Sequence, residues 1–110
     1  MKQNLFSEIS SKLRDERIDE LVASTGLRIE RIVSTGQASP PGFWYDQPGS
    51  EWVVVLSGSA GLLIEGEAQP RELRAGDYLL LPPHQRHRVE WTDAHVPTVW
   101  LAVHYRPNLC

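Results

Sequence analysis

The sequence predicts an all-β fold of short antiparallel strands, preceded by a short helical segment. From residue 27 onward, apolar and polar residues alternate with a period of two, which is typical of strands with one half-buried face. Glycine- and proline-containing turns interrupt these runs about every eight to twelve residues. Short strands with this turn spacing indicate a β-sandwich or a β-barrel.

We expect one domain with two parts, because 110 residues is close to the usual size of a single domain. In residues 1–26, Leu5, Ile9 and Leu13 recur at every fourth position, and Gly26 could end a helix. One or two short helices are therefore predicted there, covering one face or edge of the barrel. Residues 27–110 are predicted to form the barrel domain.

The strands are expected where apolar runs lie between turn residues. Residues 51–56 form the most apolar of these runs, and residues 78–81 are an apolar stretch that Pro82 and Pro83 must end. The final strand is expected to form a hairpin with the strand before it, through a loop at residues 92–97. The expected extended segments are 27–32, 43–45, 51–56, 62–64, 78–81, 88–91 and 98–105.

Composition excludes several functional classes. The net charge is −3 and no basic run is present, so we expect no nucleic-acid partner. No apolar run is long enough to cross a membrane, and the first residues lack the apolar core of a signal peptide. The single cysteine, Cys110, fits a reducing compartment. The expected location is the cytoplasm, without membrane association.

Two spaced motifs carry the chemistry. In one, Gly76 is followed by Pro82 and then by His87, on a chain that the proline pair stiffens. In the other, Glu51 and Gly58 are separated by six residues, and seventeen residues lie between Gly58 and Gly76. Together these motifs resemble the two conserved motifs of the cupin superfamily, over roughly residues 27–105. The chain is most similar to small single-domain cupins of the bacterial type.

The resemblance implies an antiparallel jelly-roll barrel. It also implies a metal site in many members, where a His-x-His pair, a glutamate and a later histidine converge on one divalent ion. This sequence keeps the glutamate and the later histidine, as Glu51 and His87, but no histidine precedes residue 84. The missing pair maps to Trp44 and Asp46 in one register.

In the other register the pair maps to Tyr45 and Gln47. We favour this second register, because a proline follows Gln47, as it often follows the second histidine in small cupins.

The candidate ligand pocket is therefore the barrel cavity. A divalent transition metal (Zn, Fe, Ni or Cu) could be held by Glu51, His87 and Gln47 with water; otherwise no cofactor is expected. Whether His104 faces the cavity depends on a one-residue register. The other two histidines, His84 and His95, are expected in surface loops. The predicted pocket residues are Tyr45, Gln47, Glu51, His87 and His104.

Three functions remain open at this stage. The first is a cupin that binds a small molecule in its cavity without catalysis, and the missing histidine pair favours it. The second is a metal-dependent cupin enzyme of the oxygenase, isomerase or lyase class. The presence of both Glu51 and His87 supports this alternative. The third is a partner-binding module with a hydrophobic outer sheet. A homodimer is also expected, since both faces of strand 51–56 are apolar or aromatic.

Overall fold

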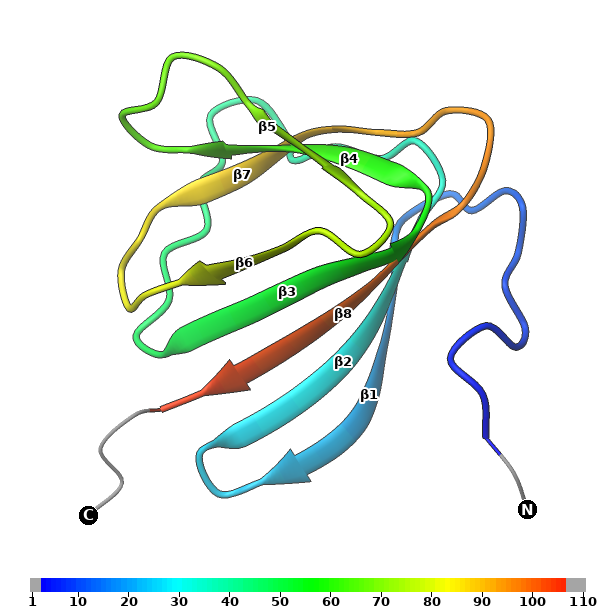
Figure 1. Cartoon of the computed structure of the whole chain (residues 1–110), viewed down its shortest axis with the longest axis horizontal. Coiled ribbons are helices and arrows are strands. Elements are labelled where there is room, and N and C mark those ends of the chain that lie inside the picture. The colour runs from blue at the N-terminus through cyan, green and yellow to red at the C-terminus, as the bar shows by residue number, and fades with distance from the viewer. Residues whose placement is uncertain (1–2, 107–110) are drawn as a thin grey trace.

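Two antiparallel β-sheets pack face to face in the computed structural model, which describes residues 3–106 (Figure 1). The larger sheet has the strand order β1-β2-β8-β3-β6, and the smaller sheet has the order β5-β4-β7. The predicted all-β jelly-roll barrel is confirmed. The strands are β1 (Arg17–Ser24), β2 (Leu27–Ser34), β3 (Ser50–Ser57), β4 (Ser59–Ile64), β5 (Arg71–Arg74), β6 (Tyr78–Leu81), β7 (His87–Thr92) and β8 (Thr98–Tyr105).

The predicted N-terminal helices are wrong. Residues 3–16 run as turns and irregular chain, and β1 forms a hairpin with β2 across a turn at Gly26, whose φ is +73°. A β-bulge between Glu20 and Val22 shifts the register of this hairpin. The bulge breaks the period of two, so the apolar residues of β1 are spaced as they would be in a helix. Within residues 3–106 there is no helix, and so none that could cross a membrane.

The predicted hairpin between the last two strands is also wrong. β8 pairs with β2 and β3 in the larger sheet, whereas β7 pairs with β4 in the smaller one. The chain therefore changes sheet in the loop at residues 93–97. It changes sheet again at Gly58, where a Cβ atom would lie 2.6 Å from the Cα of Thr98. Only glycine allows the two crossing segments to approach so closely.

The hydrophobic core lies between the two sheets. It contains residues from the inner faces of strands β3, β4, β5, β6 and β8, so neither sheet could bury its apolar face alone. The buried core residues are Val53, Val55, Ala60, Leu62, Leu73, Leu81, Trp100 and Ala102.

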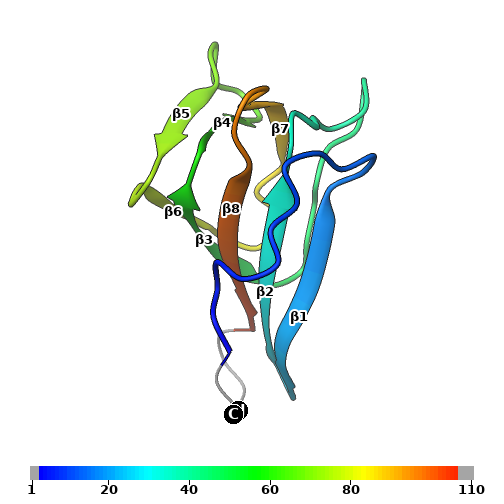
Figure 2. The same ribbon diagram turned by 90° about the vertical axis from the view of Figure 1, so that its right-hand side faces the viewer.

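The N-terminal segment covers part of the outer face of the larger sheet (Figure 2). Arg31 of β2, which is buried on this face, donates hydrogen bonds to the carbonyl oxygens of Leu5 and Ser7. Its guanidinium also pairs with Asp19 of β1 at 2.7 Å. The first residues thus pack on the sheet as irregular chain. Cys110 lies outside the described residues.

Candidate ligand-binding cavity

A cavity of about 220 Å³ lies between the sheets, directly beside the hydrophobic core. One side of its lining is apolar and the other is polar, as is usual for small-molecule sites. The apolar lining consists of Ile18, Ile32, Val53, Leu62, Val89 and Trp100. The polar lining consists of Glu16, Arg28, Glu30, Tyr45, Gln47, Glu51, His87 and His104.

The pairing of the strands explains why polar side chains enter the barrel. Glu51 of β3 lies directly opposite His104 of β8, which in turn lies opposite Arg28 of β2. Residues opposite each other in antiparallel strands share a face, so all three point inward. All five pocket residues named from the sequence line this cavity, including His104. That they bind a ligand stays a prediction.

Glu51 and His87 form the most buried polar pair of the cavity. Their side chains belong to different sheets, and His87 Nε2 lies 3.5 Å from Glu51 Oε1. The exposed fractions of the two residues are 8% and 5%. At 3.5 Å the contact is longer than a normal hydrogen bond. Glu51 Oε1 is buried and has no hydrogen-bond partner among residues 3–106.

The other ring nitrogen of His87 is fixed by the backbone. Nδ1 donates to the carbonyl oxygen of Gln85 at 2.8 Å, which directs Nε2 toward Glu51. Burial alone would lower the pKa of His87. The Glu51 carboxylate and the Gln85 carbonyl outweigh burial, so the pKa of His87 lies above its ordinary value of 6.5. The imidazolium form is therefore favoured by its surroundings.

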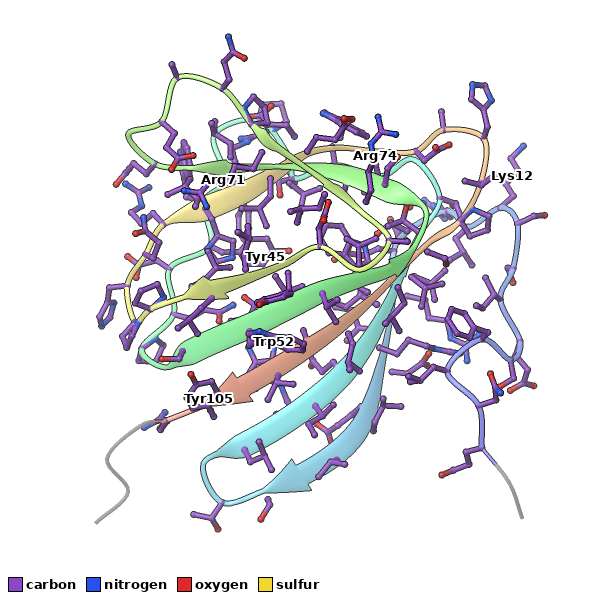
Figure 3. All side chains as sticks on the ribbon, in the orientation of Figure 1. Lys12, Tyr45, Trp52, Arg71, Arg74 and Tyr105 are labelled. Carbon is purple, nitrogen blue, oxygen red and sulfur yellow. The ribbon has the colours of Figure 1, made fainter. Side chains whose placement is uncertain are left out.

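Tyr45 holds its place through backbone contacts with His87. The two residues exchange backbone hydrogen bonds of 2.7 and 3.1 Å in an isolated β-bridge. Their rings stack, with centroids 5.3 Å apart and planes 21° from parallel; Figure 3 labels Tyr45. Burial raises the pKa of Tyr45, and the carboxylates of Glu16, Glu51 and Glu30 raise it further. Its hydroxyl stays protonated and can donate a hydrogen bond.

His104 forms a second charged cluster with Arg28 and Glu30, two cavity residues that were not predicted from the sequence. Glu30 Oε1 lies 3.1 Å from His104 Nε2, and Glu30 Oε2 accepts a hydrogen bond from Arg28 Nε at 3.0 Å. Arg28 and Glu30 alternate with apolar residues along β2, a pattern also typical of a solvent-exposed face. An inward-facing side of the strand could have been recognised because the apolar residue Ile32 follows Arg28 and Glu30 on the same face.

Glu16 is another cavity residue that the sequence analysis missed. Burial raises its pKa, a hydrogen bond with the Ser34 side chain opposes this shift, and the charge of Glu30 adds to it. Ser34 Oγ also accepts a hydrogen bond from Trp100 Nε1 at 3.1 Å. Glu16 belongs to the irregular N-terminal segment, whose sequence gives no sign that it reaches the cavity.

The remaining histidines lie away from the cavity lining. His84 Nδ1 contacts Asp46 Oδ1 at 2.8 Å in an exposed turn, and His84 has a positive φ of +59°. His95 is exposed in the loop before β8. Both therefore lie in surface loops.

The donor set fits a divalent metal only in part. Within residues 3–106, no group of three or more His, Cys, Asp or Glu side chains could hold an ion. Two observations nevertheless favour a ligand at the Glu51 and His87 pair. Glu51 Oε1 lacks a partner among the described residues, and the Nδ1 contact of His87 is the arrangement that metal-ligating histidines usually show. Gln47, which also lines the cavity, could supply its amide oxygen as a third donor.

Comparison with known proteins identifies the family. A family described as "Cupin domain" matches residues 31–104, which is more than half of the chain. The chain therefore belongs to the cupin family. The match begins after Glu16, Arg28 and Glu30, so three of the charged cavity residues lie outside it. No match was found among curated proteins.

Solved structures show the same fold. A protein from Ralstonia eutropha JMP134, provisionally named mannose-6-phosphate isomerase, is 56% identical, with a TM-score of 0.93 over 96% of this chain and 98% of that one. A cupin superfamily protein from Desulfitobacterium hafniense DCB-2 is 17% identical, with a TM-score of 0.73 over 89% and 84% of the two chains. A conserved protein of unknown function from Streptococcus pyogenes is 22% identical, with a TM-score of 0.76 over 98% and 89%. The last two resemble this chain in fold.

Proposed function

We propose that this cupin binds a small hydroxylated molecule in its barrel cavity, with the Glu51 and His87 pair at the polar end. The observation that carries the proposal is the buried oxygen of Glu51 that has no hydrogen-bond partner among residues 3–106. A buried carboxylate oxygen without a partner is costly, so a donor from a ligand would remove this cost. A ligand hydroxyl placed near His87 Nε2 would supply that donor.

The rest of the lining supports the same ligand class. The hydroxyl of Tyr45 and the amide of Gln47 can each donate and accept hydrogen bonds, as binding of several hydroxyl groups requires. Trp100 and Leu62 offer an apolar surface for the carbon skeleton. The name of the similar R. eutropha protein also favours a carbohydrate.

The proposal is tested by thermal unfolding in the presence of sugars, polyols, sugar phosphates and uronic acids. We expect at least one class to raise the melting temperature of the native chain, because a bound ligand stabilises the folded state. Glu51→Gln should abolish the shift. Glu72→Gln, which changes an exposed carboxylate in β5, should retain it. An equal shift in Glu51→Gln would show that binding occurs elsewhere.

The second candidate is a metal-dependent isomerase, favoured by the fixed orientation of His87 and by the name of the R. eutropha protein. Glu51, His87 and Gln47 would hold the ion, which would supply Lewis-acid polarisation of a carbonyl group. Tyr45 could donate a hydrogen bond to the carbonyl oxygen that becomes negative.

Elemental analysis decides whether this second candidate stands. Native protein would contain one equivalent of zinc, iron, nickel or copper after incubation with each metal, and Glu51→Ala and His87→Ala would each contain much less. Metal that remains stoichiometric in both variants would assign the site to other residues. A native protein that takes up none of the four metals would eliminate the metal-dependent enzyme.

We also propose that the chain forms a homodimer in the cytoplasm through the outer face of its larger sheet. Tyr78 and Leu80 of β6 are 64% and 55% exposed there, and the ring of Tyr78 packs against Trp52 at a centroid distance of 5.5 Å. The N-terminal segment covers the region around Arg31 instead. A second copy of the chain presents the same apolar residues, so two copies could cover each other's exposed patch in a symmetric contact.

Light scattering tests the dimer. The native chain is expected to have the mass of two copies at micromolar concentration, and Leu80→Lys should give the mass of one, because it buries a charge in the contact. Val96→Lys, which places the same charge on an exposed loop residue, should leave the mass unchanged. A native chain with the mass of one copy would contradict the proposal.

A further inference from the structure

A second, more open pocket adjoins the mouth of the cavity. It measures about 390 Å³ and shares the lining residues Arg28, Gln47 and His104 with the cavity, so the two spaces are adjacent. We call this pocket the vestibule. It lies where the turn between β1 and β2, the loop before β3 and the end of β8 meet. Figure 3 labels Tyr105, the last residue of β8 and part of its lining.

Backbone contacts connect the segments that form the vestibule. Gly49 lies so close to β8 that a Cβ atom there would be 2.9 Å from the carbonyl oxygen of Tyr105. The backbone N–H of Arg106 donates to the carbonyl oxygen of Gly26 at 3.1 Å. These contacts join the loop before β3, the end of β8 and the first hairpin.

The charge of the vestibule is opposite to that of the whole chain. Its lining contains the guanidinium groups of Arg28 and Arg106, and no aspartate or glutamate among the described residues that form it. The chain as a whole has a net charge of −3. A local cluster of positive charge in a concave site favours an anionic group.

The guanidinium group of Arg28 has free hydrogen-bond donors among the described residues, and a contact with Glu30 fixes its orientation. Of its five N–H groups, one at Nε contacts Glu30, and the terminal nitrogens make no hydrogen bond to other residues between 3 and 106. Glu30 is itself held by His104. The planar fork of an arginine fits two oxygens of a phosphate or carboxylate group at once. Because Glu30 fixes one edge of the guanidinium, less side-chain freedom is lost on binding.

The strand register sets the distance between this anion site and the deeper pair. Glu51, His104 and Arg28 lie side by side on β3, β8 and β2. Neighbouring strands are about 4.8 Å apart, so the backbones of Glu51 and Arg28 are separated by about 10 Å. A ligand that reaches both sites must carry its anionic group several bonds away from the hydroxyl or carbonyl group near Glu51.

We propose that the vestibule is an anion subsite, in which Arg28, assisted by Arg106, binds a terminal phosphate or carboxylate group of the cavity ligand. This inference rests on the proposed function and narrows its ligand class to hydroxylated metabolites with an anionic end. Sugar phosphates and sugar acids share this chemistry. The subsite is formed mainly by Arg28 of β2 and by residues 105–106. These residues lie outside the family match, which covers residues 31–104.

The first test titrates inorganic phosphate into the full chain and follows the Arg28 Nε–H signal by NMR. Phosphate should shift this signal and the backbone amides of Gly26 and Gly49 in a saturable manner. Arg28→Gln should abolish the amide shifts. Arg71→Gln, the matched control, removes an arginine that contacts Glu67 on the surface through the same Nε atom and should leave them intact (Figure 3). No saturable shift in the native chain would overturn the inference.

The second test compares mannose 6-phosphate, mannuronic acid and mannose by calorimetry. The two anionic sugars should bind at least about tenfold more tightly than mannose, and Arg28→Gln should remove this preference, whereas Arg71→Gln should retain it. If mannose 6-phosphate binds more tightly than mannose and mannuronic acid does not, the ligand is a sugar phosphate.

Equal affinities for all three sugars in the native chain would overturn the anion subsite and leave the proposed function standing. Saturable phosphate shifts without binding of any sugar would support the subsite and count against a hydroxylated ligand.

Discussion

The two ends of the cavity lie on the same strands and yet have opposite physical roles. β3 contributes Glu51 to the polar end and Val53, two residues further along the same face, to the apolar end. β8 does the same with His104 and Trp100. The backbone is continuous between the ends, so the difference lies in the side chains alone.

The apolar end stabilises the fold, and the polar end lowers its stability. Around Trp100, the apolar side chains of both sheets pack together and lose their contact with water, which is the main favourable contribution to folding. Around Glu51, the chain buries charged groups and leaves one carboxylate oxygen without a partner among residues 3–106. Binding sites commonly lower stability in this way.

The largest effect should come from the apolar end. Leu62→Ala removes a buried side chain beside the cavity, and the enlarged void should lower the free energy of unfolding by about 2–5 kcal/mol. Urea unfolding at a fixed protein concentration measures this change. Val96→Ala, on an exposed loop, should cost less than about 0.5 kcal/mol. Equal losses in the two variants would remove the distinction between core and surface at this end.

A smaller change of opposite sign is expected at the polar end. Replacing both members of the buried pair, as Glu51→Met with His87→Leu, should leave the free energy of unfolding unchanged or raise it by about 1–4 kcal/mol. Ligand-induced stabilisation should disappear in the same protein. The single variant His87→Leu is the control, because it removes the imidazole that lies 3.5 Å from the buried Glu51 carboxylate and pairs with its charge, so it should destabilise the fold. A strongly destabilised double variant would show that the pair is structural.

The smallest effect is a dependence of stability on pH between about 6 and 8, which we assign to His87 at the polar end. The pKa of His87 is raised in the folded state, so its protonated form stabilises the fold. This contribution is fully present below the unfolded pKa of about 6.5 and is lost as pH rises through the folded pKa. Glu16, whose pKa is also raised, contributes with the same sign at lower pH.

Urea unfolding at about pH 6 and pH 8 measures this dependence. The groups that face His87 are Glu51 and Tyr45, with Glu30 and His104 nearby on the same lining. We expect the loss of stability with rising pH to be smaller in His87→Gln than in the native chain, and unchanged in His95→Gln. A native slope that His87→Gln does not reduce would assign the titration to another group.

Much of the fold was predictable because its strands obey simple patterns. Strands 78–81 and 98–105 were placed with their observed ends, since prolines and loop residues delimit them. The N-terminal hairpin was not predictable in this way. Its bulge between Glu20 and Val22 removes the alternation that identifies a strand, and its side chains are mostly exposed.

The candidate site was predictable only where the family motifs lie. Glu51 and His87 could be named because motif spacing marks them, whereas Glu16, Arg28 and Glu30 carry no such mark. Which strands pair over long sequence distances could not be predicted from local patterns either. The sequence of the loop at residues 93–97 does not indicate that β8 belongs to a different sheet from β7. Hairpins join most successive strands, which is why the expected pairing was wrong.

The most direct test of the binding proposal is an NMR titration that observes the histidine rings of the native chain. Mannose, mannose 6-phosphate and mannuronic acid are the probes, and the four histidines report on different places in one experiment. We predict that at least one probe shifts the ring signals of His87 and His104, which line the cavity, and leaves exposed His95 unmoved. If no probe moves His87, or if His87 and His95 move alike, the cavity does not bind these ligands.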